Sequence, residues 1–216
     1  MAATIFSQLG ENMTTIVTIN GASRSGKDEV TNLLKQFGYK HIHPLSNLYV
    51  FLEEHLELPK GSLMDGSSKS FKPCGSDNTM AELLVDFYHF VKDRNVNWTI
   101  PHISRALDWN LKHKQSLVFS GLRNFHESRL ILNKIQDVRE DGEEIRLVSA
   151  WINRPGFGGF SSDELQRDIF DELSYNADKT LIIDNDDTLA AFLDKIKHLI
   201  KEHSLDGRRI TEAKIN

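Results

Sequence analysis

The segment Gly21–Asp28, with the sequence GASRSGKD, places two glycines and a lysine in the spacing G-x-x-x-x-G-K. Glycines at these places let the backbone curl until successive N–H groups face one anion, and a helix that begins there adds the partial positive charge of its N-terminus. The lysine would reach the β- and γ-phosphates of a nucleotide. We therefore expect the whole loop to bind a nucleotide, through Gly21, Ala22, Ser23, Arg24, Ser25, Gly26, Lys27 and Asp28.

Asp28 departs from the usual form of such a loop, in which a Ser or Thr hydroxyl ligates magnesium. A carboxylate can ligate Mg²⁺ directly or hold one of its waters, but it brings negative charge close to the phosphates. The residues alone leave two interpretations of Asp28. The loop is either a kinase variant whose metal ligand is Asp28, or a site with weakened chemistry.

The elements that must position this loop alternate between strands and helices. Short apolar, β-branched runs predict strands buried on both faces, and apolar residues recurring every three or four positions predict the helices between them. We expect strands at residues 16–20, 39–43, 116–121, 145–152 and 180–184. We expect helices at residues 30–37, 45–56, 80–91, 99–111, 131–138 and 189–200. A further helix is expected to begin at a capping box formed by Ser161 and Glu164 and to continue to Leu173. Such alternation predicts an α/β fold with a parallel sheet and helices on both of its faces.

Three further polar residues follow predicted strands, where ligands of parallel sheets gather. Arg123, Arg154 and Asn185 come just after the third, fourth and fifth strands. With Lys27, the two arginines would converge on one set of phosphates, because the planar guanidinium binds phosphate oxygens in pairs. The alternatives are a surface ion pair for Arg123 and a strand cap for Arg154.

The glycine-rich segment RPGFGGFSS and the helix after it, residues 154–173, are predicted to form a lid. Arg167 would join the phosphates when the lid closes, or it is a solvated helix residue. A second segment rich in Gly, Ser, Lys and Asp, residues 61–79, is predicted to be a mobile loop.

The composition is that of an ordinary soluble domain and excludes several classes. Apolar residues make up 39% and charged residues 26% of 216 residues, and the net charge of -5 argues against a strongly nucleic-acid-binding protein. Cys74 is the single cysteine, so we expect a reducing compartment and a cytoplasmic location. No apolar run approaches the about 20 residues of a membrane span, so we expect no membrane partner.

Four stretches, in the same order, resemble the phage-type deoxynucleoside monophosphate kinases. They are the loop GASRSGKD, the strand and arginine segment VFSGLRNFHESRLI, the strand and Arg-Pro-Gly turn VSAWINRPG, and the closing stretch ADKTLIIDNDDTLAAFLDKIKHLI. Loops ending R-S-G-K-D are usual in that family. The resemblance spans about residues 15–201.

The resemblance implies a P-loop kinase fold over residues 1–216, with a five-stranded parallel core, a helical substrate lobe inserted at residues 45–112, and the lid. It implies transfer of the γ-phosphate of ATP to a deoxynucleoside monophosphate, assisted by Mg²⁺ bound at Asp28. Lys27, Arg123 and Arg154 would be the catalytic cations. Asn185 would line the adenine pocket, or only turn the chain. A homodimer, and a host cytoplasm for a phage-encoded chain, are further expectations.

Two departures from the family concern the metal and the acceptor. Gly121 stands where the family usually has an aspartate that supports magnesium, and no Arg-x-x-x-Gln-like helix is present in the middle of the chain. In its place, Arg94 and Arg105 are candidates for binding the acceptor phosphate, and Tyr88 and Trp98 for stacking on its base. Residues of the same segment with the same potential are Lys69, Phe71 and Lys72. The alternative for the aromatics is a place in the core.

Two other functions remain open at this stage. Related phage kinases phosphorylate the hydroxymethyl group of 5-hydroxymethyluracil in DNA, which requires a carboxylate base. Glu53, Asp65 and Asp77 lie in the corresponding region. A nucleotide-binding regulator without turnover is the other possibility, motivated by Asp28 and Gly121 together.

Overall fold

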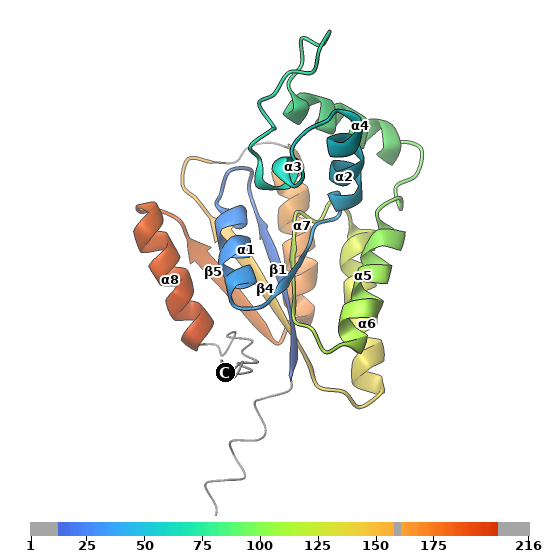
Figure 1. The fold of residues 1–216 in the computed structure, drawn as a ribbon. Helices are drawn as coiled ribbons and strands as arrows, with labels where there is room; N and C mark the ends of the chain where they lie inside the picture. Colours follow the sequence, from blue (N-terminus) through green and yellow to red (C-terminus); the bar gives the residue numbers. More distant parts are fainter. Residues whose placement is uncertain (1–12, 158–160, 203–216) are drawn as a thin grey trace, which may run out of the picture. The chain divides into compact units, whose positions relative to one another are not determined.

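A five-stranded parallel sheet forms the centre of the computed structural model, which describes residues 13–157 and 161–202 (Figure 1). The strand order is β2-β3-β1-β4-β5, and every neighbouring pair is parallel. The strands are β1 Thr14–Gly21, β2 Lys40–Ile42, β3 Leu117–Ser120, β4 Ile145–Asn153 and β5 Lys179–Asp184. The expected α/β fold is confirmed, with a five-stranded parallel sheet and a glycine-rich loop between the central strand β1 and the first helix.

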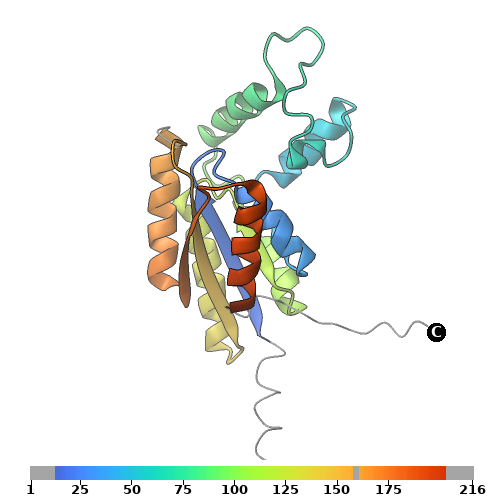
Figure 2. The same ribbon diagram turned by 90° about the vertical axis from the view of Figure 1, so that its left-hand side faces the viewer.

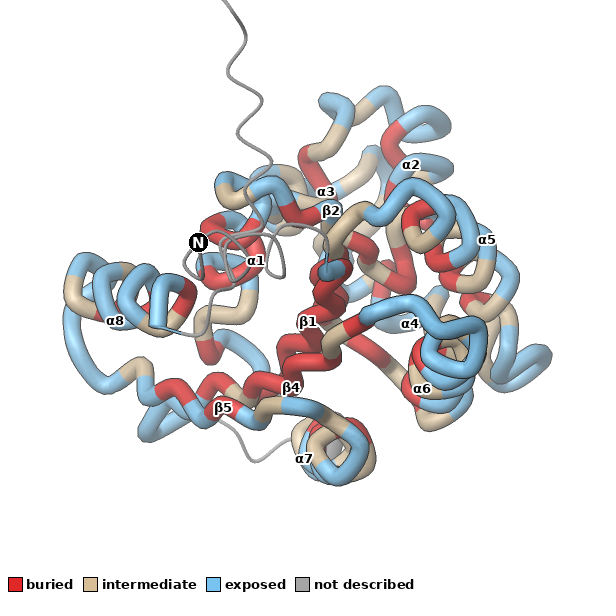
Figure 3. Tube along the Cα trace, turned by 90° about the horizontal axis from the view of Figure 1, so that it is seen from below, coloured by how far each residue is buried: buried red, intermediate tan, exposed pale blue. Residues whose placement is uncertain are grey.

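Helices cover both faces of this sheet (Figure 2). One face carries α1 Lys27–Gln36 and α8 Leu189–Glu202, and the other carries α6 Phe125–Glu140 and α7 Ser161–Asn176. Val17 and Ile19 of β1 pack into the apolar cluster beneath α1 and α8. Because side chains alternate along a strand, Thr18 and Asn20 face the α7 side. Every residue of β1 is buried, as a central strand requires (Figure 3).

Residues 43–105 form a second compact unit, and residues 13–42 and 106–202 belong to the first. The second unit contains α2 Ser46–His55, α3 Ser62–Asp65, α4 Met80–Lys92 and the first residues of α5 Ile100–Lys112. It has its own apolar cluster, formed by Leu45, Leu48, Tyr49, Leu63, Met80 and Leu84. This unit overlaps the segment predicted to be a substrate lobe. Its own core gives it a source of stability separate from the sheet.

The segment predicted to be a loop at residues 61–79 is more structured than its composition indicates. It begins with the short helix α3, and the N–H groups of Met80 and Ala81 then bond back to the carbonyls of Phe71 and Lys69. Thr79 closes the segment with a capping box, since its hydroxyl accepts from the N–H of Glu82 and the Glu82 carboxylate accepts from the N–H of Thr79. The amino-acid composition of the segment does not reveal such backbone contacts.

The predicted helices are present, and the bounds differ most for α6. The predicted helix at 131–138 extends over the whole of α6, because Asn124 caps its N-terminus by accepting from the N–H of Glu127 at 3.0 Å. The helix predicted to begin at the Ser161 and Glu164 pair is α7, which runs from Ser161 to Asn176. Among the described helices, none has the length and apolar character needed to cross a membrane.

Candidate phosphate site

The loop between β1 and α1 has the backbone shape that its glycines were expected to provide. Gly21 and Gly26 have φ angles of 150° and 105°, and α1 begins directly at Lys27. A Cβ at Gly26 would lie 2.7 Å from Asn185 Nδ2, and one at Gly21 would lie 2.6 Å from the carbonyl oxygen of Ile152. The backbone contact leaves no room for a Cβ at Gly21, whereas at Gly26 a residue with a Cβ would have to displace the Asn185 side chain and would also adopt an unfavourable positive φ. The N-terminus of α1 therefore opens into the loop with its N–H dipoles.

Lys27 folds back over the loop that precedes it. Its Nζ donates to the carbonyl oxygens of Gly21 at 2.8 Å and Ala22 at 2.6 Å. Burial lowers the pKa of the Lys27 ammonium from 10.5 to about 8; Asp28 acts in the opposite direction, Arg123 lowers the pKa further, and Asp163 raises it. The charge of Lys27 is thus concentrated at the loop, in surroundings where it is less solvated than on the surface.

Arg123 follows β3 and lies within electrostatic reach of Lys27, because its charge contributes to the lowered pKa of that lysine. Its backbone N–H donates to Glu127 Oε2 at 2.5 Å, and the Glu127 side chain is fully buried. The structure therefore brings Lys27 and Arg123 together, as expected from their places after two neighbouring strands.

Arg154 follows β4 and contacts the loop directly. Its Nη1 donates to the carbonyl oxygen of Arg24 at 3.0 Å, and its guanidinium lies 4.2 Å from the centre of the Phe157 ring. Arg24 itself has a positive φ of 62°, so this loop residue is held in the left-handed region that favours glycine. Arg154 supports the Arg24 carbonyl of that strained turn and adds a third cation to the site.

Asn185 fastens the loop from the side of β5. Its Nδ2 donates to the carbonyl oxygen of Ser25 at 2.8 Å, and its backbone N–H donates to the carbonyl oxygen of Asn153 at 2.7 Å. The Asn185 side chain therefore acts as an anchor of the phosphate loop, in addition to the turn that sequence reasoning expected. A role in adenine binding stays a prediction.

Asp28 is exposed in the first turn of α1, where a carboxylate complements the helix dipole. The Asp28 charge raises the pKa of Lys27. It also acts to raise the pKa of His41, but burial has the larger effect and lowers that pKa to about 4.

His41 lies beside the end of β3, where its Nε2 is 2.8 Å from Ser120 Oγ. Next to Ser120, Gly121 has a φ of 72°, a conformation that glycine accommodates at no cost. This conformation gives a physical reason for glycine at this position.

No cluster of three or more His, Cys, Asp or Glu side chains arranged for a metal ion occurs within residues 13–157 and 161–202. Magnesium in nucleotide sites commonly uses one or two carboxylates together with substrate phosphates and waters. Asp28 fits this kind of site, because it is a single carboxylate in the first turn of α1, next to the loop. Mg²⁺ would then be held jointly by Asp28 and the nucleotide.

Asp163 is a neighbour of the loop that sequence reasoning missed. Its Oδ1 accepts from the backbone N–H of Ser23 at 3.2 Å, and its charge raises the pKa of Lys27. In the sequence, Asp163 resembles an ordinary acidic residue in the first turn of a helix, and 140 residues separate it from Ser23. Only the pairing of the strands brings the two segments together.

Arg167, predicted to join the phosphates, is engaged within α7. It pairs with Asp171 one turn later at 3.4 Å and lies over the rings of Trp151 and Phe170. Of the predicted lid, residues 158–160 and the side chains of Ser161 and Ser162 lie outside the described part. Participation of Arg167 in catalysis stays a prediction.

The acceptor candidates of the second unit have local partners. Tyr88 and Trp98 pack against its apolar cluster with ring centres 6.5 Å apart. Arg94 donates to the carbonyl oxygen of Phe90 and lies 3.6 Å over its ring, and Arg105 donates to the carbonyl oxygen of Pro101. The two aromatics are thus partly buried against a core, and acceptor binding by these four residues stays a prediction.

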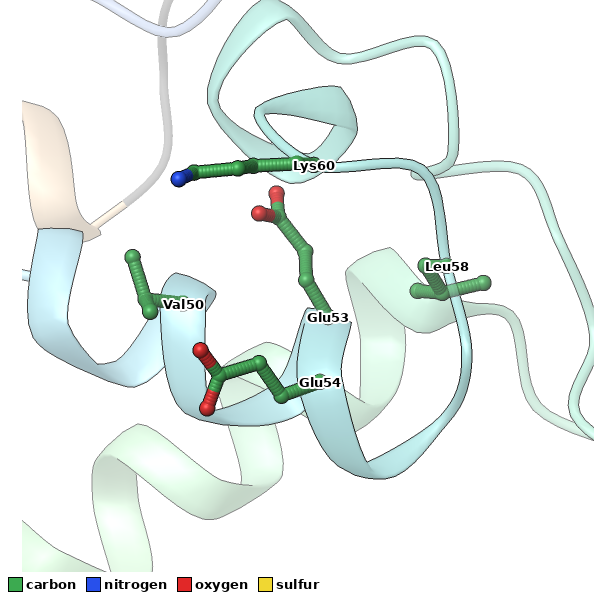
Figure 4. Close-up of a pocket in the computed structure, with 5 residues that line it drawn as sticks. All are labelled: Val50, Glu53, Glu54, Leu58 and Lys60. Carbon is green, nitrogen blue, oxygen red and sulfur yellow. The ribbon is translucent and has the colours of Figure 1, made fainter.

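Glu53, a candidate base for the alternative reaction, has a structural environment. Its side chain is buried, and its two oxygens accept from the N–H groups of Gly61 at 2.7 Å and Leu63 at 2.8 Å. Figure 4 shows Glu53 beside a hollow lined also by Val50, Glu54, Leu58 and Lys60. The hollow measures about 80 Å³, too small for a nucleotide, whose sites typically exceed about 300 Å³. Glu53 therefore secures the turn before α3.

Asp65, the second candidate base, accepts hydrogen bonds from Ser67. The Ser67 N–H donates to its carboxylate at 2.8 Å, and the hydrogen bonds from Ser67 hold its pKa below the ordinary value. A general base near neutral pH needs the opposite shift.

Among solved structures, the chain is similar to a dephospho-CoA kinase from Campylobacter jejuni, with 14% sequence identity and a TM-score of 0.47 over 90% of this chain and 98% of that one. It is also similar to the protein TT1252 from Thermus thermophilus, with 18% identity and a TM-score of 0.40 over 88% of this chain and 98% of that one. No protein-family model and no curated protein matches the chain. The geometry of the phosphate loop therefore carries the functional argument.

Proposed function

We propose that the protein is an ATP- and Mg²⁺-dependent kinase that transfers the γ-phosphate to a deoxynucleoside monophosphate. The observation that carries this proposal is the gathering of three cations at one phosphate loop. Lys27 bonds to loop carbonyls, Arg154 bonds to the loop residue Arg24, and Arg123 acts electrostatically on Lys27. The three residues come from the ends of three different strands, a convergence that a simple glycine turn would not need.

This set of groups suits phosphoryl transfer, which depends on positioning and positive charge more than on covalent chemistry by the protein. The N–H groups of the loop and α1 would hold the β- and γ-phosphates. Lys27 and the two arginines would neutralise the charge that spreads over the transferring group. Mg²⁺, when bound between Asp28 and the nucleotide, would supply further charge neutralisation.

The acceptor is assigned from the resemblance in the four sequence stretches, and the composition agrees with it. A net charge of -5 favours a small anionic substrate held by local arginines over a long DNA substrate. The environments of two candidate general bases also favour a monophosphate acceptor over modified DNA, because Glu53 is buried and accepts two backbone hydrogen bonds, and hydrogen bonds from Ser67 lower the pKa of Asp65.

Coupled measurement of ADP production tests this function with each deoxynucleoside monophosphate and, separately, with DNA containing 5-hydroxymethyluracil. We expect turnover with at least one monophosphate, and a loss of about a hundredfold or more in Lys27→Ala because a preorganised charge is removed. Lys35→Ala, at an exposed lysine in the last turn of α1, serves as the control and keeps activity.

The alternatives give different results in the same assay. Turnover with modified DNA alone would replace the monophosphate by a DNA base as the acceptor. ATP binding without ADP production from any acceptor would support a regulator. Full activity of Lys27→Ala would contradict the site itself.

A further inference from the structure

The peptide group between Leu122 and Arg123 is bonded at both ends by side chains of two helices. Its carbonyl oxygen accepts a hydrogen bond from Gln166 Nε2 of α7. Its N–H donates to Glu127 Oε2 of α6 at 2.5 Å. The peptide is trans, so its C=O and N–H point in opposite directions, and the two side chains hold it from opposite sides.

These two contacts are shielded from water. Glu127 is 0% exposed, Gln166 is 9% exposed and Leu122 is 1% exposed. Hydrogen bonds in such surroundings are electrostatically stronger than in water. A fully buried carboxylate is costly unless hydrogen bonds offset its desolvation. The N–H of Arg123 is one of the donors that make this burial tolerable.

The helices that supply the two side chains are themselves tied together. Glu172 of α7 accepts from the Ser128 hydroxyl and from Arg129 Nε of α6, the latter at 2.9 Å. Asn124 adds a contact from its Nδ2 to Glu127 Oε1 at 3.3 Å. Because these contacts join α6 to α7, Glu127 and Gln166 hold the peptide from two helices that are bonded to each other.

The backbone at this place needs such support. Residues 121–124 lie between β3 and α6 and belong to neither, and Gly121 has a left-handed conformation. The peptide plane before a residue fixes the direction in which its side chain leaves the backbone. A rotation of the Leu122–Arg123 peptide would move the Arg123 guanidinium, and displacements near 1 Å can cost about a hundredfold in a transfer reaction.

We propose that Glu127 and Gln166 are positioning residues that hold Arg123 for binding phosphate, by fixing both ends of the Leu122–Arg123 peptide. The proposal rests on the phosphate-binding role proposed above for Arg123. It predicts that each residue acts on the ligand through Arg123, and that neither contributes once the arginine side chain is absent.

A double-mutant cycle with Arg123→Ala and Gln166→Leu tests the proposal, with the dissociation constant of ATP in the presence of Mg²⁺ as the readout. We expect ATP affinity to fall about tenfold in Arg123→Ala and about threefold in Gln166→Leu, while Gln166→Leu adds less than about 1.5-fold in the Arg123→Ala background. Gln136→Leu, an exposed glutamine of α6, is the matched control and leaves affinity unchanged. Equal losses from Gln166→Leu in both backgrounds would overturn the proposal, as would an Arg123→Ala variant with wild-type affinity.

The variant Gln166→Glu provides a second measurement that a packing role would not affect. The carboxyl group that it introduces can donate to the Leu122 carbonyl only when protonated, and burial raises the pKa of such a group. We expect its ATP affinity relative to the wild type to recover as the pH falls from 8 to 5.5, by about twofold or more. A pH-independent ratio would contradict a donor role for Gln166, even if Gln166→Leu failed to fold.

Failure of this proposal and failure of the proposed reaction are distinguishable. If the two mutations are coupled in ATP binding but no acceptor is phosphorylated, the positioning role stands and the proposed kinase reaction is wrong. If an acceptor is phosphorylated but the two mutations act independently, the kinase reaction stands and the positioning role is wrong.

Discussion

At the scale of single residues, two glycines with positive φ angles differ in the space that surrounds them. Gly26 has both a left-handed backbone and no room for a Cβ, which would lie 2.7 Å from Asn185 Nδ2 and 3.2 Å from Phe192 Cε1. Gly142, in the turn before β4, has a similar φ of 79° but nothing within 4 Å. A comparison of Gly26 with Gly142 therefore separates the free-energy cost of a left-handed backbone from the cost of a steric collision at Cβ.

We therefore expect Gly26→Ala to be more destabilising than Gly142→Ala. The second change carries only the strain of a left-handed non-glycine residue, about 1 kcal/mol. The first adds the displacement of Asn185 and Phe192, for a total of about 2–4 kcal/mol. Urea unfolding of both variants measures the difference, and equal midpoints would contradict the predicted collision.

The lowered pKa of Lys27 predicts a pH dependence of ATP binding. Because the free protein holds this pKa at about 8 and phosphate stabilises the ammonium form, binding above pH 8 should be coupled to proton uptake. ATP affinity should fall as the pH rises, approaching about tenfold per pH unit until the higher pKa of the complex is reached. Calorimetry in buffers of different ionisation enthalpy measures the uptake, which should be absent in Lys27→Met. If proton uptake persisted in Lys27→Met, the proton would be taken up by a group other than Lys27.

The same shift has the opposite consequence for folding. The unfolded chain keeps the ordinary pKa of 10.5, so between pH 8 and 10.5 the unfolded state binds more protons than the folded state. The contribution of Lys27 to the free energy of unfolding therefore increases as the pH rises through that window. Holding a charged Lys27 in its half-buried place opposes folding at neutral pH, while its charge favours binding.

At the scale of elements, the turn between β5 and α8 supports the loop between β1 and α1. The contact from Asn185 Nδ2 to the Ser25 carbonyl joins residues 160 positions apart. We expect Asn185→Ala to weaken ATP binding by about three- to tenfold, because a loop that must order on binding loses affinity. Asn153→Ala removes an exposed contact to Asp184 on the same sheet edge and serves as the control. Equal affinity in the two variants would show that the loop keeps its shape without Asn185.

The elements also show which features the sequence could predict. The strands and the loop glycines follow from local patterns, since a buried strand and a left-handed turn restrict the residues at their own positions. The Ser23–Asp163 contact and the bonds from Glu127 and Gln166 to one peptide depend on how strands pair and helices pack. Glu53 looked like a candidate base because a glutamate's burial cannot be recognised from its neighbours in the chain.

At the scale of the whole molecule, the two compact units have separate apolar cores. Among the described residues, the cluster around β1 contains fifteen buried residues, including Val17, Val118 and Val148, whereas the cluster of residues 43–105 contains six. Regions with fewer buried apolar contacts open with lower free energies. The groups assigned here to ATP all belong to the first unit, so opening of the second unit should leave the phosphate loop intact.

Two fully buried leucines allow this independence to be tested: Leu63 in the second unit and Leu147 on β4 in the first. Replacing either by alanine should cost about 2–5 kcal/mol of local stability through the cavity that it leaves. In Leu63→Ala, hydrogen exchange should accelerate in α2 and α4 while β1 and β4 keep their protection, with ATP affinity within about twofold of the wild type. In Leu147→Ala, exchange should accelerate across the sheet and ATP affinity should fall. If Leu63→Ala accelerated exchange equally in β1 and β4, the two units would unfold as one, and ATP binding would depend on both cores.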